Sequence, residues 1–159
     1  MKICFVCQGN IIRSPLAENI FKQLASEKRI EDNYQVGSAG TSAYHVGEEP
    51  DSRMRQIARE NGLIYTGRAK QFRRDDFGRF DLIVALDKAN RRILQDWAAT
   101  TDQAKKIHLM REYDPQGGED LDVPDPYYGG IDGFTTTFEI VYRSCVGLLK
   151  ELEGDQDSP

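Results

Sequence analysis

Two residues whose side chains could together bind an oxyanion and react with it lie close to each other in the sequence, near the start of the chain. Cys7 and Arg13 enclose the residues Gln-Gly-Asn-Ile-Ile, and Ser14 follows. If those five residues curl, their backbone N–H groups converge and form a concave anion site. Arg13 could clamp two oxygens of a tetrahedral ion, while Cys7 would sit under the same N–H groups, which favour a thiolate. Ser14 could donate a hydrogen bond to that sulfur, so the pattern predicts a nucleophilic thiolate in an oxyanion cradle.

The flanking sequence predicts the elements that hold this loop in place. An apolar run over 2–6 is typical of a strand, and apolar residues at four-residue steps over 14–28 indicate a helix. Gly9 permits a positive φ angle, and Asn10 tolerates the left-handed region. Pro15 suits a first helical turn. A helix that begins at the end of the loop would add its unpaired N–H groups and its positive dipole end to the cradle.

The rest of the chain alternates strand-like and helix-like segments. We expect strands at 2–6, 34–39, 80–86 and 106–109, and helices at 14–28, 51–61, 88–97 and 133–152. This order predicts an α/β fold of a single domain, with a four-stranded parallel sheet flanked by helices on both faces. The loop after the first strand, a phosphate-binding loop in this interpretation, then lies in the crevice at the carboxyl ends of the strands. We expect the domain to cover residues 1–153 and the polar tail 154–159 to be frayed.

Composition narrows the classes of function. A chain of 159 residues can bury a sizeable core. Its net charge of −5 argues against binding to nucleic acid or to an anionic membrane. No apolar stretch is long enough to span a bilayer, and no signal peptide is evident at the start. Three cysteines without metal-type spacing suggest a reducing compartment, and we therefore expect the cytoplasm. The sequence does not indicate an oligomeric state.

The string from Cys7 to Pro15, Cys-Gln-Gly-Asn-Ile-Ile-Arg-Ser-Pro, resembles the low-molecular-weight protein tyrosine phosphatase family. A second segment, Asp125-Pro-Tyr-Tyr, resembles the general-acid segment of that family. Segments at 38–42 and 47–51 are also similar, so the resemblance covers nearly the whole chain. It implies hydrolysis of phosphotyrosine through a cysteinyl-phosphate on Cys7. Arg13 would hold the phosphate oxygens, and Asp125 would protonate the departing phenolate.

The resemblance also assigns supporting roles. Ser38 would support the loop through a hydrogen-bond network that includes Asn10. An aromatic rim for a phenyl ring would consist of Tyr44, Tyr127 and Tyr128. The phosphate-binding loop itself would comprise Gln8, Gly9, Asn10, Ile11, Ile12 and Ser14. Expected partners are phosphotyrosine-containing proteins, with inorganic phosphate or a similar oxyanion in the loop. We expect no cofactor and no metal, because the cradle supplies the positive charge.

The chain departs from the family pattern at two positions. Ile12 stands where many members have a second cysteine. Gly67 stands where members often have a histidine that supports the loop through an aspartate matching Asp87. Gly67 has no side chain for this purpose, so the sequence assigns no role to Asp87.

Two alternatives remain open at this point. An arsenate reductase of the same fold would need further cysteines to carry oxidation out of the site. Cys145 on an apolar helix stripe and Cys4 inside a strand are badly placed for that task. A catalytically silent phosphotyrosine-binding module is the other alternative, and the presence of Cys7, Arg13 and Asp125 argues against it.

Overall fold

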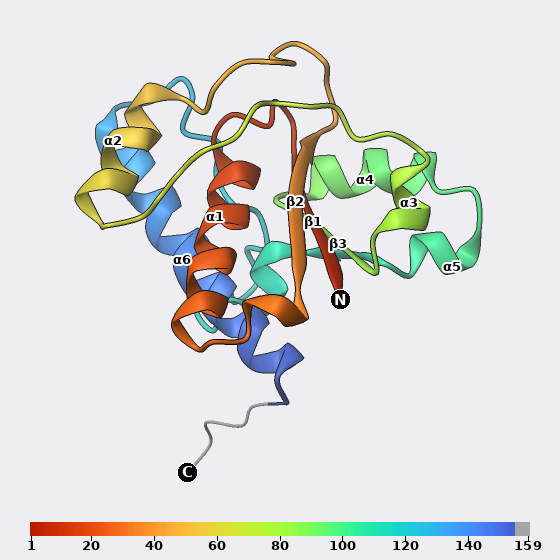
Figure 1. Cartoon of the computed structure of the whole chain (residues 1–159). Helices are drawn as coiled ribbons and strands as arrows, with labels where there is room; N and C mark the ends of the chain where they lie inside the picture. Colours follow the sequence, from red (N-terminus) through yellow and green to blue (C-terminus); the bar gives the residue numbers. More distant parts are fainter. Residues whose placement is uncertain (155–159) are drawn as a thin grey trace.

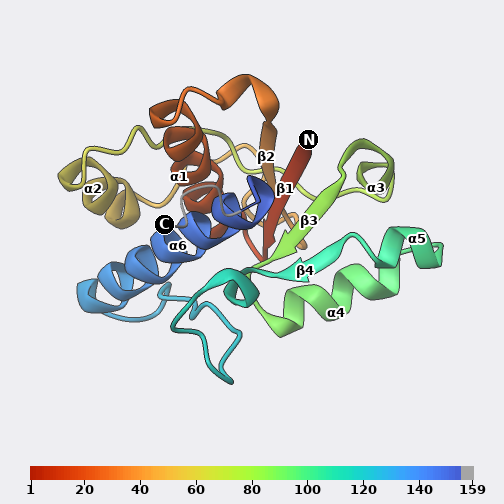
Figure 2. The same ribbon diagram turned by 90° about the horizontal axis from the view of Figure 1, so that it is seen from below.

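The apolar run at the start of the chain forms an inner strand of a four-stranded parallel sheet. The computed structural model describes residues 1–154, and the strand order in its sheet is β2-β1-β3-β4. Strand β1 pairs with β2 from Lys2 opposite Gln35 to Cys7 opposite Gly40. The strands are β1 (Lys2–Cys7), β2 (Gln35–Gly40), β3 (Leu82–Ala85) and β4 (Ile107–Leu109). Figure 2 shows them side by side, with β1 between β2 and β3.

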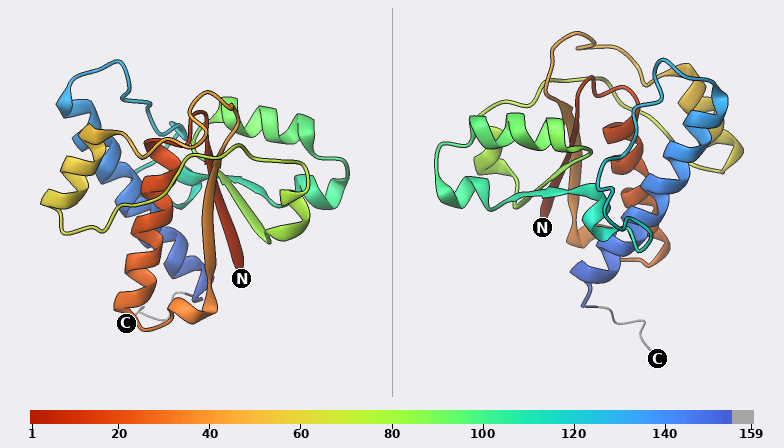
Figure 3. Two further views of the ribbon diagram at one scale, coloured as in Figure 1. Left: turned by 45° about the horizontal axis from the view of Figure 1, so that its top comes forward. Right: turned by 180° about the vertical axis from the view of Figure 1, so that it is seen from behind.

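Helices cover both faces of this sheet, as the alternating pattern predicted. Figure 1 shows α1, α2 and α6 on one side of the sheet and α3, α4 and α5 on the other. The two further views in Figure 3 show α6 running beside α1. The helices are α1 (Arg13–Glu27), α2 (Ser52–Glu60), α3 (Asp76–Arg79), α4 (Lys88–Trp97), α5 (Thr101–Ala104) and α6 (Ile131–Leu152), with short 3-10 turns at Glu31–Asn33 and Met110–Tyr113.

Alternation along β1 divides the core into two clusters. Ile3, Phe5 and Cys7 belong to the cluster shared with α1, α2 and α6. Cys4 and Val6 belong to the other cluster, which includes residues of α3 and α4. Successive side chains of a strand point to opposite faces of the sheet. A strand buried on both faces reads as a continuous apolar run for the same reason.

The predicted fold class is confirmed, and most predicted element boundaries are within two residues of the observed ones. Asp51 caps α2 by accepting a hydrogen bond from the backbone N–H of Arg53 at 2.8 Å. Gly62, just past the end of α2, has a φ of 72°, which suits a residue that stops a helix. The helical turn α5 was not predicted. It is stabilised by Thr100, whose hydroxyl accepts from the N–H of Gln103 at 3.1 Å.

Helix α6 is the last element of the described residues, and Glu153, just after it, accepts a hydrogen bond from Tyr34. Of the predicted polar tail, residues 155–159 lie outside the described residues. None of the helices in residues 1–154 combines the length and the apolarity that crossing a bilayer requires.

Candidate active site

The loop from Cys7 to Arg13 connects the end of β1 to the start of α1, at the carboxyl edge of the sheet. Asn10 has a φ of 56°, so the chain bends there through the left-handed region. The backbone N–H groups of Gly9, Ile11, Ile12 and Arg13 donate to no acceptor within residues 1–154. A loop with several unpaired N–H groups in succession, followed by a helix N-terminus, is suited to hold an anion.

Cys7 lies at the bottom of this loop, with 3% of its surface exposed. Its Sγ is 2.9 Å from the Oγ of Ser14. The backbone N–H of Asn10 donates to the same sulfur at 3.3 Å. Hydrogen-bond donors in this position can stabilise negative charge that develops on the sulfur.

A hydrogen-bond network fixes the bend of the loop. The side-chain amide of Asn10 donates to Ser14 at 2.8 Å and to Ser38 at 3.0 Å. The Asn10 carbonyl oxygen accepts from the backbone N–H of Lys70 at 2.9 Å. Ser38 in turn donates to Glu18 at 2.7 Å. Because Asn10 is buried and both its amide nitrogen and its carbonyl oxygen are hydrogen-bonded, these contacts restrain its side chain to one conformation.

Within residues 1–154, the side chain of Arg13 makes hydrogen bonds only through Nη1. Its Nη1 donates to Asp87 at 2.7 Å and to the carbonyl of Val123 at 2.9 Å, which occupies both hydrogens of that nitrogen. No hydrogen bond engages Nε anywhere in the described chain. Burial alone would lower the pKa of Arg13, but the negative charges of Cys7 and Asp87 outweigh it and raise that pKa, so the group stays cationic. The edge formed by Nε and Nη2 is left for two oxygens of a bound anion.

Asp125 comes from the long loop before α6 and approaches Arg13 from the open side. Its Oδ2 is 3.6 Å from Nη2 of Arg13, and its side chain is 43% exposed. Its Oδ1 accepts from the N–H of Tyr127 at 3.1 Å, a local turn that orients the carboxyl group. The segment before it is anchored, because the N–H of Val123 donates to the carbonyl of Leu86 at 2.9 Å.

Arg53 of α2 reaches the loop that carries Asp125. Its guanidinium lies 5.5 Å from the ring centre of Tyr127 and 4.4 Å from that of Phe134. It also pairs with Asp51 at 2.9 Å. Cationic groups are attracted to aromatic faces at such distances. Arg53 therefore links α2 to the acid loop and to the first turns of α6.

Cys7, Arg13 and Asp125 line one cavity of about 500 Å³. Tyr44 and Tyr128 stand at its mouth with 86% and 95% of their surfaces exposed. The ring of Tyr127 packs edge-on against Tyr128, with the ring centres 4.9 Å apart. The lining residues are Cys7, Gln8, Gly9, Ile11, Ile12, Arg13, Ser42, Tyr44, His45, Glu48, Asp125, Tyr127 and Tyr128. The cavity thus has a floor that carries unpaired N–H groups and the guanidinium of Arg13, and an aromatic mouth.

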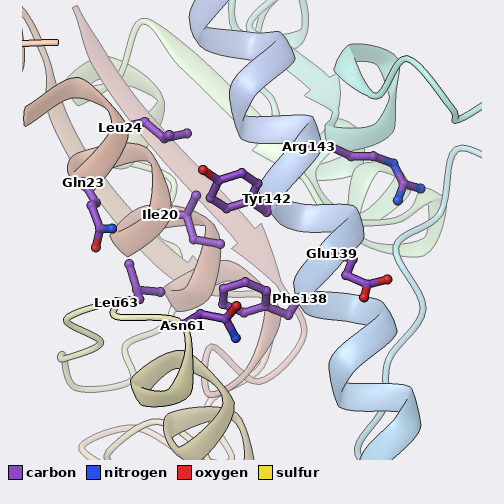
Figure 4. A pocket seen from close by; sticks show the side chains of 9 residues that line it. All are labelled: Ile20, Gln23, Leu24, Asn61, Leu63, Phe138, Glu139, Tyr142 and Arg143. Carbon is purple, nitrogen blue, oxygen red and sulfur yellow. The ribbon is translucent and has the colours of Figure 1, made fainter. Parts of the chain in front are cut away.

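A second cavity of about 490 Å³ lies between α1, the segment after α2, and α6. Figure 4 shows its apolar side chains, among them Ile20, Leu63 and Phe138. Its lining residues include no cysteine, so it offers no thiol nucleophile. Within residues 1–154, no group of three or more His, Cys, Asp or Glu side chains is arranged to hold a metal ion.

The other two cysteines are placed differently from Cys7. Burial raises the pKa of Cys4 and of Cys145 far above the ordinary value, so both remain neutral thiols. Cys4 lies on the opposite face of the sheet from Cys7. All three cysteines are free. Neither Cys4 nor Cys145 is therefore suited to a reaction that needs a thiolate.

Sequence reasoning gave no role to Asp87, which binds Arg13, to Arg53, or to Tyr65, whose hydroxyl donates to the carbonyl of Ile12. It also did not predict the cavity-lining residues Ser42, His45 and Glu48. Asp87 lies two residues after the end of the buried strand β3, and this position at the carboxyl edge of the sheet was a usable signal. Arg53 and Tyr65 gave no comparable signal, because their contacts join segments far apart in the sequence.

Comparison with known proteins gives consistent results. A family model described as "Low molecular weight phosphotyrosine protein phosphatase" matches residues 2–158. A Streptomyces coelicolor protein described as a low molecular weight protein-tyrosine-phosphatase is 44% identical over 149 residues, which cover 93% of this chain and 91% of the relative.

Solved structures with this fold are also similar. A protein tyrosine phosphatase from Entamoeba histolytica has a TM-score of 0.92 at 36% identity, covering 98% of this chain and 99% of the other. A Drosophila arginine phosphatase has a TM-score of 0.90 at 34% identity, covering 98% and 100%.

Proposed function

The chain belongs to the low-molecular-weight protein tyrosine phosphatase family, and on that premise we propose that it hydrolyses phosphotyrosine through a cysteinyl-phosphate on Cys7. The observation that carries this proposal is the convergence of Cys7, Arg13 and Asp125 on one cavity with an aromatic mouth. A nucleophile, an anion clamp and a proton donor are the three groups that the reaction needs.

In the first step, the thiolate of Cys7 attacks phosphorus on the side opposite the phenolic oxygen. A sulfur–phosphorus bond forms as the bond from phosphorus to the phenolic oxygen breaks. Asp125, in its protonated form, gives its proton to the departing oxygen, so that tyrosine leaves as a neutral phenol. The partly exposed position of Asp125 at the open side of Arg13 is suited to this role.

In the second step, a water molecule attacks the phosphorus of the cysteinyl-phosphate. Asp125, now a carboxylate, takes a proton from that water, and the sulfur–phosphorus bond breaks. Cys7 leaves as a thiolate, and inorganic phosphate is the product. Ser14, 2.9 Å from the sulfur, stabilises the charge that returns to it.

Charge stabilisation comes from the protein itself. The free edge of Arg13 binds two oxygens of the phosphoryl group, and the unpaired N–H groups of the loop face the remaining charge. Donors that are already oriented cost no reorganisation when charge develops in the transition state. The proposed reaction therefore uses no metal ion and no cofactor.

Specificity for phosphotyrosine is supported by the depth of the site. Cys7 is almost fully buried, whereas Tyr44 and Tyr128 at the mouth are almost fully exposed. A substrate must span this depth with a rigid arm, and a phenyl ring does so while contacting the apolar side chains of Ile11 and Ile12. The side chain of phosphoserine is too short to bring its phosphate from the mouth of the cavity to Cys7.

The biological setting follows as a further part of the proposal. We place the enzyme in the cytoplasm, because a thiolate nucleophile and three free cysteines suit a reducing compartment. Its partners would be phosphotyrosine-containing proteins, with inorganic phosphate in the loop after turnover. The net charge of −5 disfavours nucleic acid and anionic membranes as partners.

A substrate panel without added metal tests the proposal. We expect turnover of phenyl phosphate, p-nitrophenyl phosphate and phosphotyrosine peptides, with low kcat/KM on phosphoserine peptides. Phosphoarginine belongs in the panel because a structural neighbour is described as an arginine phosphatase. Arsenate reduction is measured in parallel with a thiol reductant.

Each alternative has its own signature in this panel. Arsenate reduction without aryl phosphate turnover would indicate the reductase, and binding without any turnover would indicate a silent module. Comparable kcat/KM on phosphoserine and phosphotyrosine peptides would overturn the proposed specificity.

A further inference from the structure

Tyr65 supports the phosphate loop from the outside. It lies in the connection between α2 and α3, far from the loop in sequence, and only 8% of its surface is exposed. Its hydroxyl donates to the carbonyl of Ile12 at 2.9 Å and lies 3.4 Å from the carbonyl of Ile11. Both carbonyls belong to the five residues enclosed by Cys7 and Arg13.

The two carbonyls have other donors on the same outer side. The carbonyl of Ile11 accepts from the N–H of Asp51 at 2.8 Å, and that of Ile12 accepts from the N–H of Leu16 at 3.2 Å. In a trans peptide the N–H points away from the C=O of the same unit. Holding these carbonyls outward therefore directs the N–H groups of Ile12 and Arg13 inward.

Those inward N–H groups are the unpaired ones. Neither the N–H of Ile12 nor that of Arg13 has an acceptor in residues 1–154, and both residues line the catalytic cavity. When no anion is bound, these N–H groups have no acceptor among the described residues on the cavity side to fix their direction. Their orientation then depends on hydrogen bonds to the carbonyls on the other side of the loop.

We propose that Tyr65 is a positioning residue of this phosphatase: its hydroxyl fixes the orientation of the Ile11 and Ile12 peptide units, and thereby the anion affinity of the loop. It does not touch the substrate. The inference rests on the proposed function, because the oriented N–H groups are the ones that would bind the phosphoryl oxygens.

The hydroxyl remains a donor over the working pH range. Burial raises the pKa of Tyr65 well above its ordinary value, and the nearby charge of Cys7 acts in the same direction. Gly67, two residues later, contributes no side chain to the loop. This connection therefore supports the loop through the hydroxyl of Tyr65 and through the backbone N–H of Lys70, which donates to the side chain of Asn10. Of these two groups, only the hydroxyl of Tyr65 contacts the peptide units of Ile11 and Ile12.

The test is Tyr65→Phe, which removes the hydroxyl and keeps the ring. Orthovanadate affinity is measured by calorimetry, without turnover, and kcat/KM is measured on p-nitrophenyl phosphate. We expect both to fall by about 3- to 10-fold, the effect of losing one hydrogen bond of ordinary strength. The ratio of kcat/KM between p-nitrophenyl and phenyl phosphate should stay unchanged, because Asp125 is not altered.

Tyr34→Phe is the matched control. Tyr34 packs against Phe21 and donates its hydroxyl to Glu153, at the opposite end of the strands from the loop. Its loss should leave vanadate affinity within about twofold of wild type, even if thermal stability falls.

Three outcomes would overturn the inference. The first is an orthovanadate affinity of Tyr65→Phe within about twofold of wild type. The second is an equal loss of orthovanadate affinity in Tyr65→Phe and Tyr34→Phe. The third is a Tyr65→Phe protein that does not fold, which would show that the hydroxyl stabilises the core in general. A wild-type protein that binds vanadate but turns over no aryl phosphate would sink the proposed function alone.

Discussion

Replacing Asp87 with asparagine should weaken both the fold and the catalysis, because the two carboxylate oxygens have two different tasks. Oδ1 caps α4 by accepting from the backbone N–H of Asn90 at 2.8 Å and from its side-chain amide at 2.7 Å. Oδ2 accepts from Arg13 at 2.7 Å. Asparagine has one oxygen and one NH₂ group, so it can perform only one of these tasks in either orientation of its amide.

The magnitude follows from the two orientations. If the oxygen keeps the cap, the NH₂ group meets the guanidinium of Arg13, and a charge-assisted hydrogen bond worth about 1.5–3 kcal/mol is lost. If the amide flips, the cap is lost, at about 1 kcal/mol. We therefore expect a stability loss of about 1–3 kcal/mol, or roughly 2–10 °C in Tm for a chain of this size.

In free energy, the catalytic effect should be comparable to the effect on folding. Without the charge of Asp87, Arg13 keeps only the carbonyl of Val123 as a partner on that side. A displacement of about 1 Å at a clamp of this kind can cost on the order of 10²-fold in rate. We expect kcat/KM on p-nitrophenyl phosphate to fall by about 10- to 100-fold.

Urea unfolding and steady-state kinetics on the same preparations measure the two effects. Asp122→Ala is the control, because Asp122 accepts from the N–H of Lys88 at 2.8 Å and so stabilises the same helix start. It should lose about 1 kcal/mol of stability and keep its kcat/KM. A folded Asp87→Asn protein with kcat/KM within about threefold of wild type would refute the reasoning.

Three further changes probe other parts of the molecule. Arg53→Met removes the cation that lies against the ring of Tyr127, in the loop that carries Asp125. We expect kcat to fall by about 3- to 10-fold, with the largest loss for substrates with poor leaving groups. An equal loss for good and poor leaving groups would contradict this. Burial would raise the pKa of Asp114, but hydrogen bonds from Arg143 and other donors outweigh it and lower that pKa. The carboxylate of Asp114 therefore contributes to the free energy of unfolding above about pH 4, and this contribution is lost as pH falls further. The stability difference between wild type and Asp114→Asn should therefore shrink in acid, and urea midpoints at pH 7 and pH 3 test this. Peroxide should inactivate Cys7 without forming an internal disulfide, and Ile12→Cys should restore recovery by thiols; peptide mapping that finds mainly a disulfide in the oxidised wild type would contradict it.

Periodicity was sufficient to predict the fold. The apolar run over 2–6, the apolar stripe of α6 and the cap at Asp51 are local signals, and the structure has the corresponding elements at those places. The turn α5 was missed because four residues are too few to show a helical period. The crevice position of the first loop followed from the parallel order of the strands.

Contacts between distant segments could not be derived in this way. The pair of Arg13 and Asp87 joins residues 74 positions apart, and the hydrogen bond from Tyr65 to Ile12 spans 53. No local pattern encodes such partners, because they depend on how the layers pack. Because Gly67 has no side chain, the sequence analysis gave Asp87 no partner. The structure shows that Asp87 binds Arg13 instead.

The most direct test of the account is to trap the covalent intermediate. Enzyme is mixed rapidly with p-nitrophenyl phosphate, stopped with denaturant, digested and mapped by mass spectrometry. We predict one phosphoryl group on the peptide that contains Cys7, in an amount that rises before steady-state turnover is reached. Continued turnover with the phosphoryl group on a different residue, or undiminished turnover by Cys7→Ser, would contradict the account.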